Sequence, residues 1–256
     1  MADYVRIIPC LDMKGGRIVK GVHIVNLRDA GDPVENAMFY ETQGADEIAM
    51  LDITATVDGR KTHVEVVRKV AAAVSVPVTV GGGISSLDDI AQLMDAGASS
   101  ISISSAAFRN PALISEAAER FGSQKIIVAI DVDRNRNLAS GYEVWIDGGR
   151  TATGADALEF ARKAKELGAG QLLPTSKATD GTKAGYDLAI TRAMAEETGL
   201  PVIASGGAGT MEHMFLAVVE GKASGLLAAS VFHFREISIP ELKKYLSERG
   251  VEVSQR

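Results

Sequence analysis

Aromatic residues, cysteine and positive charge are all scarce in this chain of 256 residues. Aromatic residues make up 5% of the sequence and hydrophobic residues 46%, so the core must be built from aliphatic side chains. That composition is typical of parallel strands covered by helices on both faces. Cys10 is the only cysteine, which excludes an intramolecular disulfide and favours a cytoplasmic location. The net charge of −6 lacks the basic excess of nucleic-acid-binding proteins, so we expect no nucleic acid partner.

Long apolar segments are absent as well. No segment approaches the roughly 18 consecutive apolar residues of a membrane span, so we expect no association with a membrane. The first residues lack the apolar run and cleavage site of a signal peptide. The four histidines are scattered along the chain, which argues against a metal site.

Short β-branched runs alternate with longer segments whose apolar residues have helical spacing. The helical segments include 34–43, 62–73, 87–96 and 155–167. Eight alternating units in a chain of this length favour a single (β/α)₈ barrel, an α/β fold, over the alternative of a doubly wound open sheet. The predicted strands are Arg6–Leu11, Glu47–Ile53, Val76–Val80, Ser100–Ser104, Lys125–Asp131, Gly170–Thr175, Pro201–Ser205 and Gly225–Ala229.

An internal repeat supports the barrel. IIPCLDMKGGR from Ile7 resembles IIVAIDVDRNR from Ile126, and VGGGI and SISSAAF resemble ASGGA and LLAASVF further along the chain. The three matches keep their order at separations of 119 to 124 positions, which indicates one barrel made of two half-barrels, about 1–122 and 123–256. A hairpin, Tyr142–Ile146 turning at 147–149, is predicted after the fifth strand.

Asp12 and Asp131 end the first and fifth strands, which lie opposite each other in a ring of eight. The loops at the carboxyl ends of the strands form the working face of such barrels. A lone aspartate there most often caps the following turn. Because two occur symmetrically, we favour a general acid and a general base that act on one substrate.

Glycine clusters follow the third and seventh strands, and small or hydroxyl residues follow the fourth and eighth. Glycines let backbone N–H groups approach an anion closely, whereas a single cluster would indicate only a tight turn. Their duplication predicts two phosphate sites and hence an elongated bisphosphate substrate. Lys20 lies in the loop Met13–Pro33, which is long enough to act as a lid. The two clusters are Gly81–Gly83 with Ser104 and Ser105, and Gly206 and Gly207 with Ala229 and Ser230.

Longer motifs resemble the cyclase subunit of imidazole glycerol phosphate synthase, an enzyme of histidine biosynthesis. They include RIIPCLDMKGGRIVKG, LDITAT, VTVGGGI, DGTKAGYD, PVIASGGAG and LAASVFHFREI, and together they cover nearly the whole chain. The resemblance implies a duplicated (β/α)₈ barrel without metal or organic cofactor. The implied reaction joins ammonia from a glutaminase partner to a phosphoribulosyl-formimino carboxamide ribotide. Its products are imidazole glycerol phosphate and aminoimidazole carboxamide ribotide.

The resemblance also implies roles for particular residues. Asp12 matches the general base, Asp131 the general acid and Lys20 an assisting lysine of the first loop. The glutaminase would dock on the N-terminal face of the barrel. Gly82, Gly83 and Ser105 match one phosphate anchor, and Gly181, Gly207, Ala229 and Ser230 match the other. We also place Ser104, Thr175, Asp180, Ser205 and Gly206 at the substrate site.

Several positions depart from the family pattern, and they cluster. Ser104 replaces an asparagine at the substrate site, Lys177 replaces an apolar residue, and Pro174 falls within a strand, where proline is normally excluded. Ser100 and Gln171 replace a lysine and a glutamate of the charged ring around Arg6 and Glu47 that gates ammonia.

These departures leave three interpretations open. The chain is a working cyclase, a paralogue or redesigned barrel with altered chemistry, or a scaffold without turnover. In the second case Lys177 would form a Schiff base with a carbonyl substrate in a retro-aldol reaction, although a lysine that extends to solvent or binds phosphate is the simpler interpretation. Loss of charge at Ser99, Ser100 and Gln171 predicts weakened glutaminase docking and ammonia passage.

Overall fold

Eight parallel strands form the centre of the molecule in the computed structural model, which describes residues 4–22, 25–53, 55 and 62–256. Each strand is followed by at least one helix before the next strand begins. The eight strands are β1 (Arg6–Lys14), β4 (Ile48–Asp52), β5 (Val78–Gly81), β6 (Ser100–Ile103), β7 (Ile126–Arg134), β10 (Gln171–Ser176), β11 (Ile203–Ala204) and β12 (Gly225–Ala228).

The strands close into a ring. Continuous pairing runs from β11 through β12, β1, β4, β5 and β6 to β7, and β10 pairs with β7 on its other side. Two isolated parallel bridges, Leu172 with Val202 and Thr175 with Ser205, join β10 to the segment around β11. The predicted (β/α)₈ barrel is therefore confirmed, and β1 and β7 lie on opposite sides of the ring.

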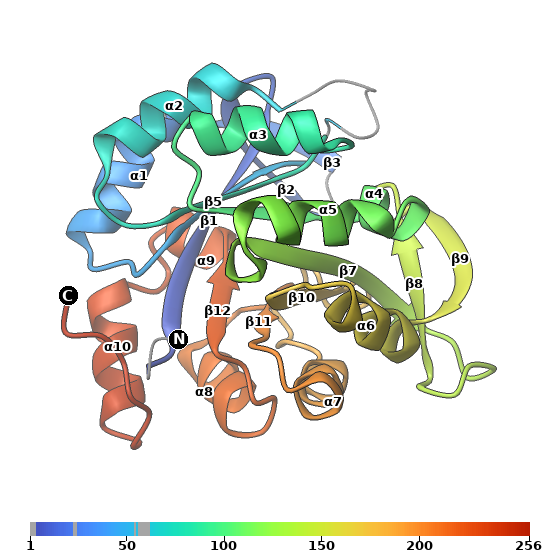
Figure 1. The fold of residues 1–256 in the computed structure, drawn as a ribbon. Helices are drawn as coiled ribbons and strands as arrows, with labels where there is room; N and C mark the ends of the chain where they lie inside the picture. Colours follow the sequence, from blue (N-terminus) through green and yellow to red (C-terminus); the bar gives the residue numbers. More distant parts are fainter. Residues whose placement is uncertain (1–3, 23–24, 54, 56–61) are drawn as a thin grey trace.

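Helices surround the strands (Figure 1). Among the described residues, none of them is long and apolar enough to cross a membrane. They are α1 (Pro33–Thr42), α2 (Val64–Ala73), α3 (Leu87–Asp95), α4 (Ser105–Arg109), α5 (Ala112–Phe121), α6 (Ala157–Glu166), α7 (Leu188–Thr198), α8 (Met211–Val219), α9 (Ser230–His233) and α10 (Ile239–Ser247), with a 3₁₀ turn η1 (Ser123–Lys125).

Two antiparallel hairpins extend the barrel at equivalent places. The predicted hairpin after the fifth strand is confirmed as β8 (Tyr142–Ile146) and β9 (Thr151–Asp156), and it projects from the end of β7 in Figure 1. The segment Met13–Pro33, which the sequence presents as one long loop, instead contains β2 (Arg17–Val22) paired with β3 (Val25–Gly31). Its β-branched residues continue the pairing from the end of β1, which the loop interpretation overlooked.

The repeat extends to the caps and turns of the two halves. Asp32 and Asp156 follow the two hairpins and cap α1 and α6 through their carboxylates. Ser104 and Ala229, which precede the short helices α4 and α9, have similar backbone angles (φ −121°, ψ −95° and φ −110°, ψ −76°). The exact boundary between the half-barrels stays a prediction.

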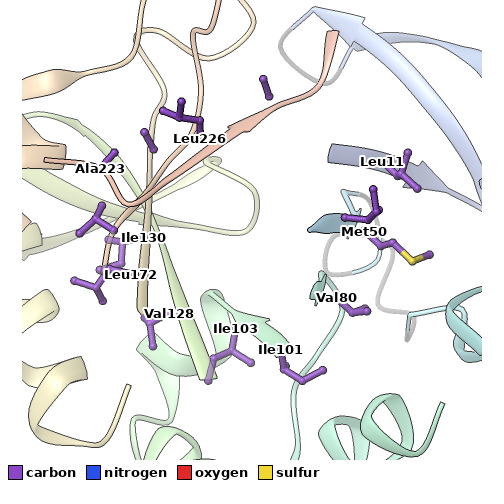
Figure 2. Close-up of a cluster of buried hydrophobic side chains, with 14 of the residues drawn as sticks. Leu11, Met50, Val80, Ile101, Ile103, Val128, Ile130, Leu172, Ala223 and Leu226 are labelled. Atoms are coloured by element: carbon purple, nitrogen blue, oxygen red, sulfur yellow. The ribbon is translucent and has the colours of Figure 1, made fainter. Parts of the chain in front are cut away.

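The hydrophobic core has two layers because successive strand residues point to opposite faces. The larger layer lies between strands and helices and includes Leu11, Met50, Val80 and Val128 (Figure 2). The smaller layer fills the barrel interior and consists of Ile8, Cys10, Ala49, Ile127, Leu173, Ile203 and Leu227. Its side chains are aliphatic or small, as the scarcity of aromatic residues predicts.

Pro174 lies within β10 and pairs with Ile130 of β7. The amide of Leu172 donates to the carbonyl of Pro201, so the alternation of the strand directs the nitrogen of Pro174 to the same side, toward β11. Pairing on that side consists of isolated bridges at Leu172 and Thr175. The missing N–H therefore falls in a gap of the pairing, which explains how a proline is accommodated there.

Candidate active site

The alternation of β1 and β7 brings the two aspartates into the mouth of the barrel. Ile8 and Cys10 of β1 belong to the interior layer, and Asp12 is the next residue on the same face. Ile127 begins the corresponding series on β7, which ends with Asp131. An apolar interior thus gives way to carboxylates at the carboxyl ends of two opposite strands.

Asp12 and Asp131 both line one cavity of about 500 Å³. Its wall comes from the ends of β1, β4, β7, β10, β11 and β12 and from the turn of the β8–β9 hairpin. The described residues that line it are Cys10, Asp12, Val19, Leu51, Ile53, Asp131, Gly148, Gly149, Arg150, Thr175, Lys177, Asp180, Gly181, Lys183, Ser205, Gly206, Gly207, Ala208, Leu227, Ala228, Ala229 and Ser230.

The environment of Asp131 favours its protonated form. Burial at the floor of the cavity raises its pKa to about 7, and the nearby carboxylate of Asp180 adds to this effect. Lys177 and the backbone N–H of Gly149, which donates a hydrogen bond to the Asp131 carboxylate, act in the opposite direction. A carboxyl group that titrates near neutral pH is suited to donate a proton at that pH.

Asp12 has a different immediate partner. The thiol of Cys10 donates to Oδ1 of Asp12 with the two atoms 3.0 Å apart. Both residues line the cavity from the same face of β1. The two carboxylates therefore face one cavity in different surroundings, an arrangement that can separate an acid from a base.

The second-half residues that we predicted for the phosphate anchor or for the substrate site come together at the cavity. The anchor residues Gly181, Gly207, Ala229 and Ser230 line its wall, and so do the substrate-site residues Thr175, Asp180, Ser205 and Gly206. Gly207 has a φ of +102°, and a Cβ there would overlap with the carbonyl of Gly185. A close packing contact thus requires this glycine whatever the site binds.

The residues of the first-half anchor do not line this cavity. Gly82 resembles Gly207, with a φ of +89° and no room for a Cβ against the backbone of Asp52. Ser105 is buried, and its Oγ accepts a hydrogen bond from the backbone N–H of Asp147 at 2.9 Å. Gly83 and Ser104 do not line the cavity either. A first-half phosphate site stays a prediction.

The turn of the β8–β9 hairpin was missing from the predicted site. This turn, Asp147–Gly149, has contacts on two sides. The backbone N–H of Asp147 donates to Ser105, and the backbone N–H of Gly149 stabilises the carboxylate of Asp131. Both carboxylate oxygens of Asp147 lie 2.7 Å from Nη2 of Arg109 at the end of α4. The sequence predicts the turn itself but offers no signal for these contacts, because the partners are 38 to 42 positions apart.

The two lysines singled out from the sequence have different outcomes. Lys177 lines the cavity, but its Nζ lies 3.0 Å from the ring centre of Trp145 and 3.7 Å from the carboxylate of Asp133. Both partners attract an ammonium group, so these contacts do not favour a Schiff-base lysine. The backbone of Lys20 lies opposite that of Arg28 in the register of the β2–β3 hairpin, and the side chain of Lys20 lies outside the described part of the structure.

Polar side chains also close the opposite, N-terminal end of the barrel. Ser100 and Gln171 leave Arg6 and Glu47 without the lysine and the glutamate that the resemblance implies, but both residues still have partners in the structure. Arg6 donates to Glu47 at 2.6 Å and to the side-chain oxygen of Gln171 at 2.5 Å, and Thr79 also donates to Glu47. Gln171 thus replaces a carboxylate as acceptor, since an amide oxygen can serve the same guanidinium.

Within the described ranges, no group of three or more histidine, cysteine, aspartate or glutamate side chains is placed to hold a metal ion. Comparison with known protein families shows to which family the chain belongs. The model of a family described as histidine biosynthesis protein matches residues 6–238, which include every strand of the barrel and both aspartates.

Proposed function

This chain belongs to the family of histidine biosynthesis proteins, and we propose that within it the chain is the cyclase subunit of imidazole glycerol phosphate synthase. The observation that carries the proposal is the pair Asp12 and Asp131, which face one cavity from opposite strands. In the proposed reaction ammonia and a phosphoribulosyl-formimino carboxamide ribotide give imidazole glycerol phosphate, aminoimidazole carboxamide ribotide and water.

The two aspartates divide the proton transfers. Asp131, whose pKa is raised to about 7, is protonated in part at neutral pH and donates a proton to the substrate. Asp12 accepts a proton from the attacking nitrogen on the other side of the cavity. Asp180, Gly207 and Ser230 belong to the wall where one substrate phosphate would bind. The second phosphate would bind toward Gly82, Gly83 and Ser105.

Ammonia would come from a glutaminase docked on the N-terminal face and enter past Arg6, Glu47 and Gln171. Arg6 donates a hydrogen bond to Glu47 and another to Gln171 at this end of the barrel. Passage therefore requires that at least one of these bonds opens. With Ser100 and Gln171 in place of charged residues, we expect docking and ammonia passage to be weak.

Turnover with ammonium salts tests the proposal without the partner. The bisphosphate substrate is supplied with ammonium chloride, and the loss of its absorbance is followed for the parent and for Asp12→Asn and Asp131→Asn. We expect turnover in the parent and a loss of at least about 100-fold in either variant. The control is Asp95→Asn, at an exposed position at the end of α3. No turnover by the parent at high ammonium would overturn the proposal.

A further inference from the structure

The turn of the β8–β9 hairpin connects two elements that the barrel itself keeps apart. Asp147 at its start contacts α4 through Ser105 and Arg109. Gly149, two residues later, lines the same cavity as Asp131 of β7, and its backbone N–H stabilises the Asp131 carboxylate. Asp131 also pairs with Trp145 of β8, so the hairpin lies directly beside it. A displacement of the turn from α4 would therefore move the hydrogen-bond donor of Asp131.

We propose that the Arg109–Asp147 ion pair is a clasp that holds this turn in place and thereby positions Asp131 for proton transfer. Arg109 and Asp147 are positioning residues, since neither lines the cavity. This role rests on the proposed function only in naming Asp131 as the acid. The mechanical link from Arg109 to Gly149 stands on the contacts alone.

The conformation of the turn explains why it needs such a clasp. Asp147 has a φ of 57°, and Gly148 and Gly149 also have positive φ values, so three successive residues adopt left-handed backbone angles. Two adjacent glycines leave the backbone many alternatives in the absence of external contacts. The contacts of Asp147 with Arg109, Ser105 and Thr151 limit these alternatives at one end.

Trp145 offers a spectroscopic signal for the position of the turn. It is the only tryptophan of the chain and is the penultimate residue of β8, two positions before Asp147. Nζ of Lys177 lies over its ring, and the carbon atoms of the same lysine pack against Gly149. Movement of the turn would change this environment and hence the fluorescence of Trp145.

Two variants break the clasp by different routes. Asp147→Asn removes the charge but keeps a side chain that tolerates positive φ, so it does not add backbone strain. Arg109→Ala leaves the sequence of the turn unchanged. The matched control is Arg192→Ala, which breaks an exposed 2.7 Å ion pair with Glu196 on α7.

The readout is the titration of Asp131, followed by NMR of protein labelled at the aspartate carboxyl carbon and assigned with Asp131→Asn. Loss of the Gly149 donor leaves the carboxylate less stabilised, so its pKa must rise. The other charged groups around the cavity are Asp12, Arg150, Lys177, Asp180 and Lys183. Asp12, Asp180 and Lys183 lie outside the turn, whereas Arg150 follows Gly149 in the chain and Lys177 packs against it. Displacement of these two cations would act on the Asp131 pKa in the same direction, upward.

We expect Asp147→Asn and Arg109→Ala each to raise the Asp131 pKa by about half a unit. The double variant should add nothing further, because the clasp is already open. Both variants should shift Trp145 fluorescence, and Arg192→Ala should change neither quantity. An unchanged or lowered Asp131 pKa in both clasp variants would overturn the proposal. Because these readouts need no turnover, a failure of the cyclase assay would leave this test intact.

Discussion

At the scale of single residues, the chemistry depends on what surrounds each aspartate. Strand alternation directs Asp12 and Asp131 into the barrel, and their spacing along the repeat allows this to be predicted from the sequence. The raised pKa of Asp131 could not be predicted in this way. It arises from burial and from Asp180, which is 49 positions away along the chain. Only the fold places these two carboxylates near each other.

Burial of Asp131 predicts a pH-dependent cost to stability. Its pKa is about 7 in the folded protein and 3.8 in the absence of perturbation, so between these values the folded state holds a proton that the unfolded state has lost. Stability must therefore fall as the pH rises from 4 to 7. We expect Asp131→Asn to be more stable than the parent at pH 8 by about 2 kcal/mol.

Urea unfolding at pH 4 and pH 8 checks this expectation. The two proteins should differ little at pH 4, where the Asp131 carboxyl is protonated and resembles an amide. An equal difference in unfolding free energy at both pH values would show that Asp131 does not titrate near neutral pH.

At the scale of elements, most of the fold could be predicted because strand and helix periods are strong signals. All eight strands lie within a few residues of the predicted ranges. The hairpin after β7 was also predicted, because Asp147, Gly148 and Gly149 form a recognisable turn. The first hairpin was missed because its strands contain several charged residues and because the sequence between them has no comparable turn signal. The clasp on α4 was missed because periodicity carries no information about contacts between elements.

One buried ion pair fastens α10 to the remainder of the barrel. Nζ of Lys243 lies 2.9 Å from Oδ1 of Asp46, and the other carboxylate oxygen of Asp46 accepts from the amide of Ile7. Lys243→Met would leave a buried carboxylate without its cation. We expect a loss of about 3–5 kcal/mol in the free energy of unfolding, measured by urea denaturation.

The neighbouring Lys244 provides the control. Its side chain is 76% exposed, at 3.8 Å from Glu248. Lys244→Met should change the unfolding free energy by less than about 0.5 kcal/mol. If both variants were equally stable, the buried pair would not contribute as described.

At the scale of the whole molecule, the barrel separates two ends that carry different sets of polar side chains. The C-terminal end carries the cavity with both aspartates, and the N-terminal end carries the bonded side chains Arg6, Glu47 and Gln171. The sequence predicts both sets of residues. It did not predict that Gln171 would complete the contacts of Arg6.

The uncharged side chains Ser100 and Gln171 at the N-terminal end lead to a prediction about the glutaminase partner of the proposed function. We expect glutamine-dependent turnover to be low in the parent and to rise several-fold in the double variant Ser100→Lys, Gln171→Glu, which restores the charges of the family pattern. Ammonium-dependent turnover should stay unchanged, because neither position lines the cavity. A parent that already couples fully to the glutaminase would contradict this expectation.

In the proposed function Asp12 and Asp131 perform proton transfer in one cavity and do not merely shape it. Calorimetric binding of the bisphosphate substrate to Asp12→Asn and Asp131→Asn, beside their turnover with ammonium, distinguishes the two roles. We expect both variants to bind the substrate within about threefold of the parent affinity but to lose turnover, since removing an acid or base affects the transition state. Variants that lose binding in proportion to turnover would contradict this expectation.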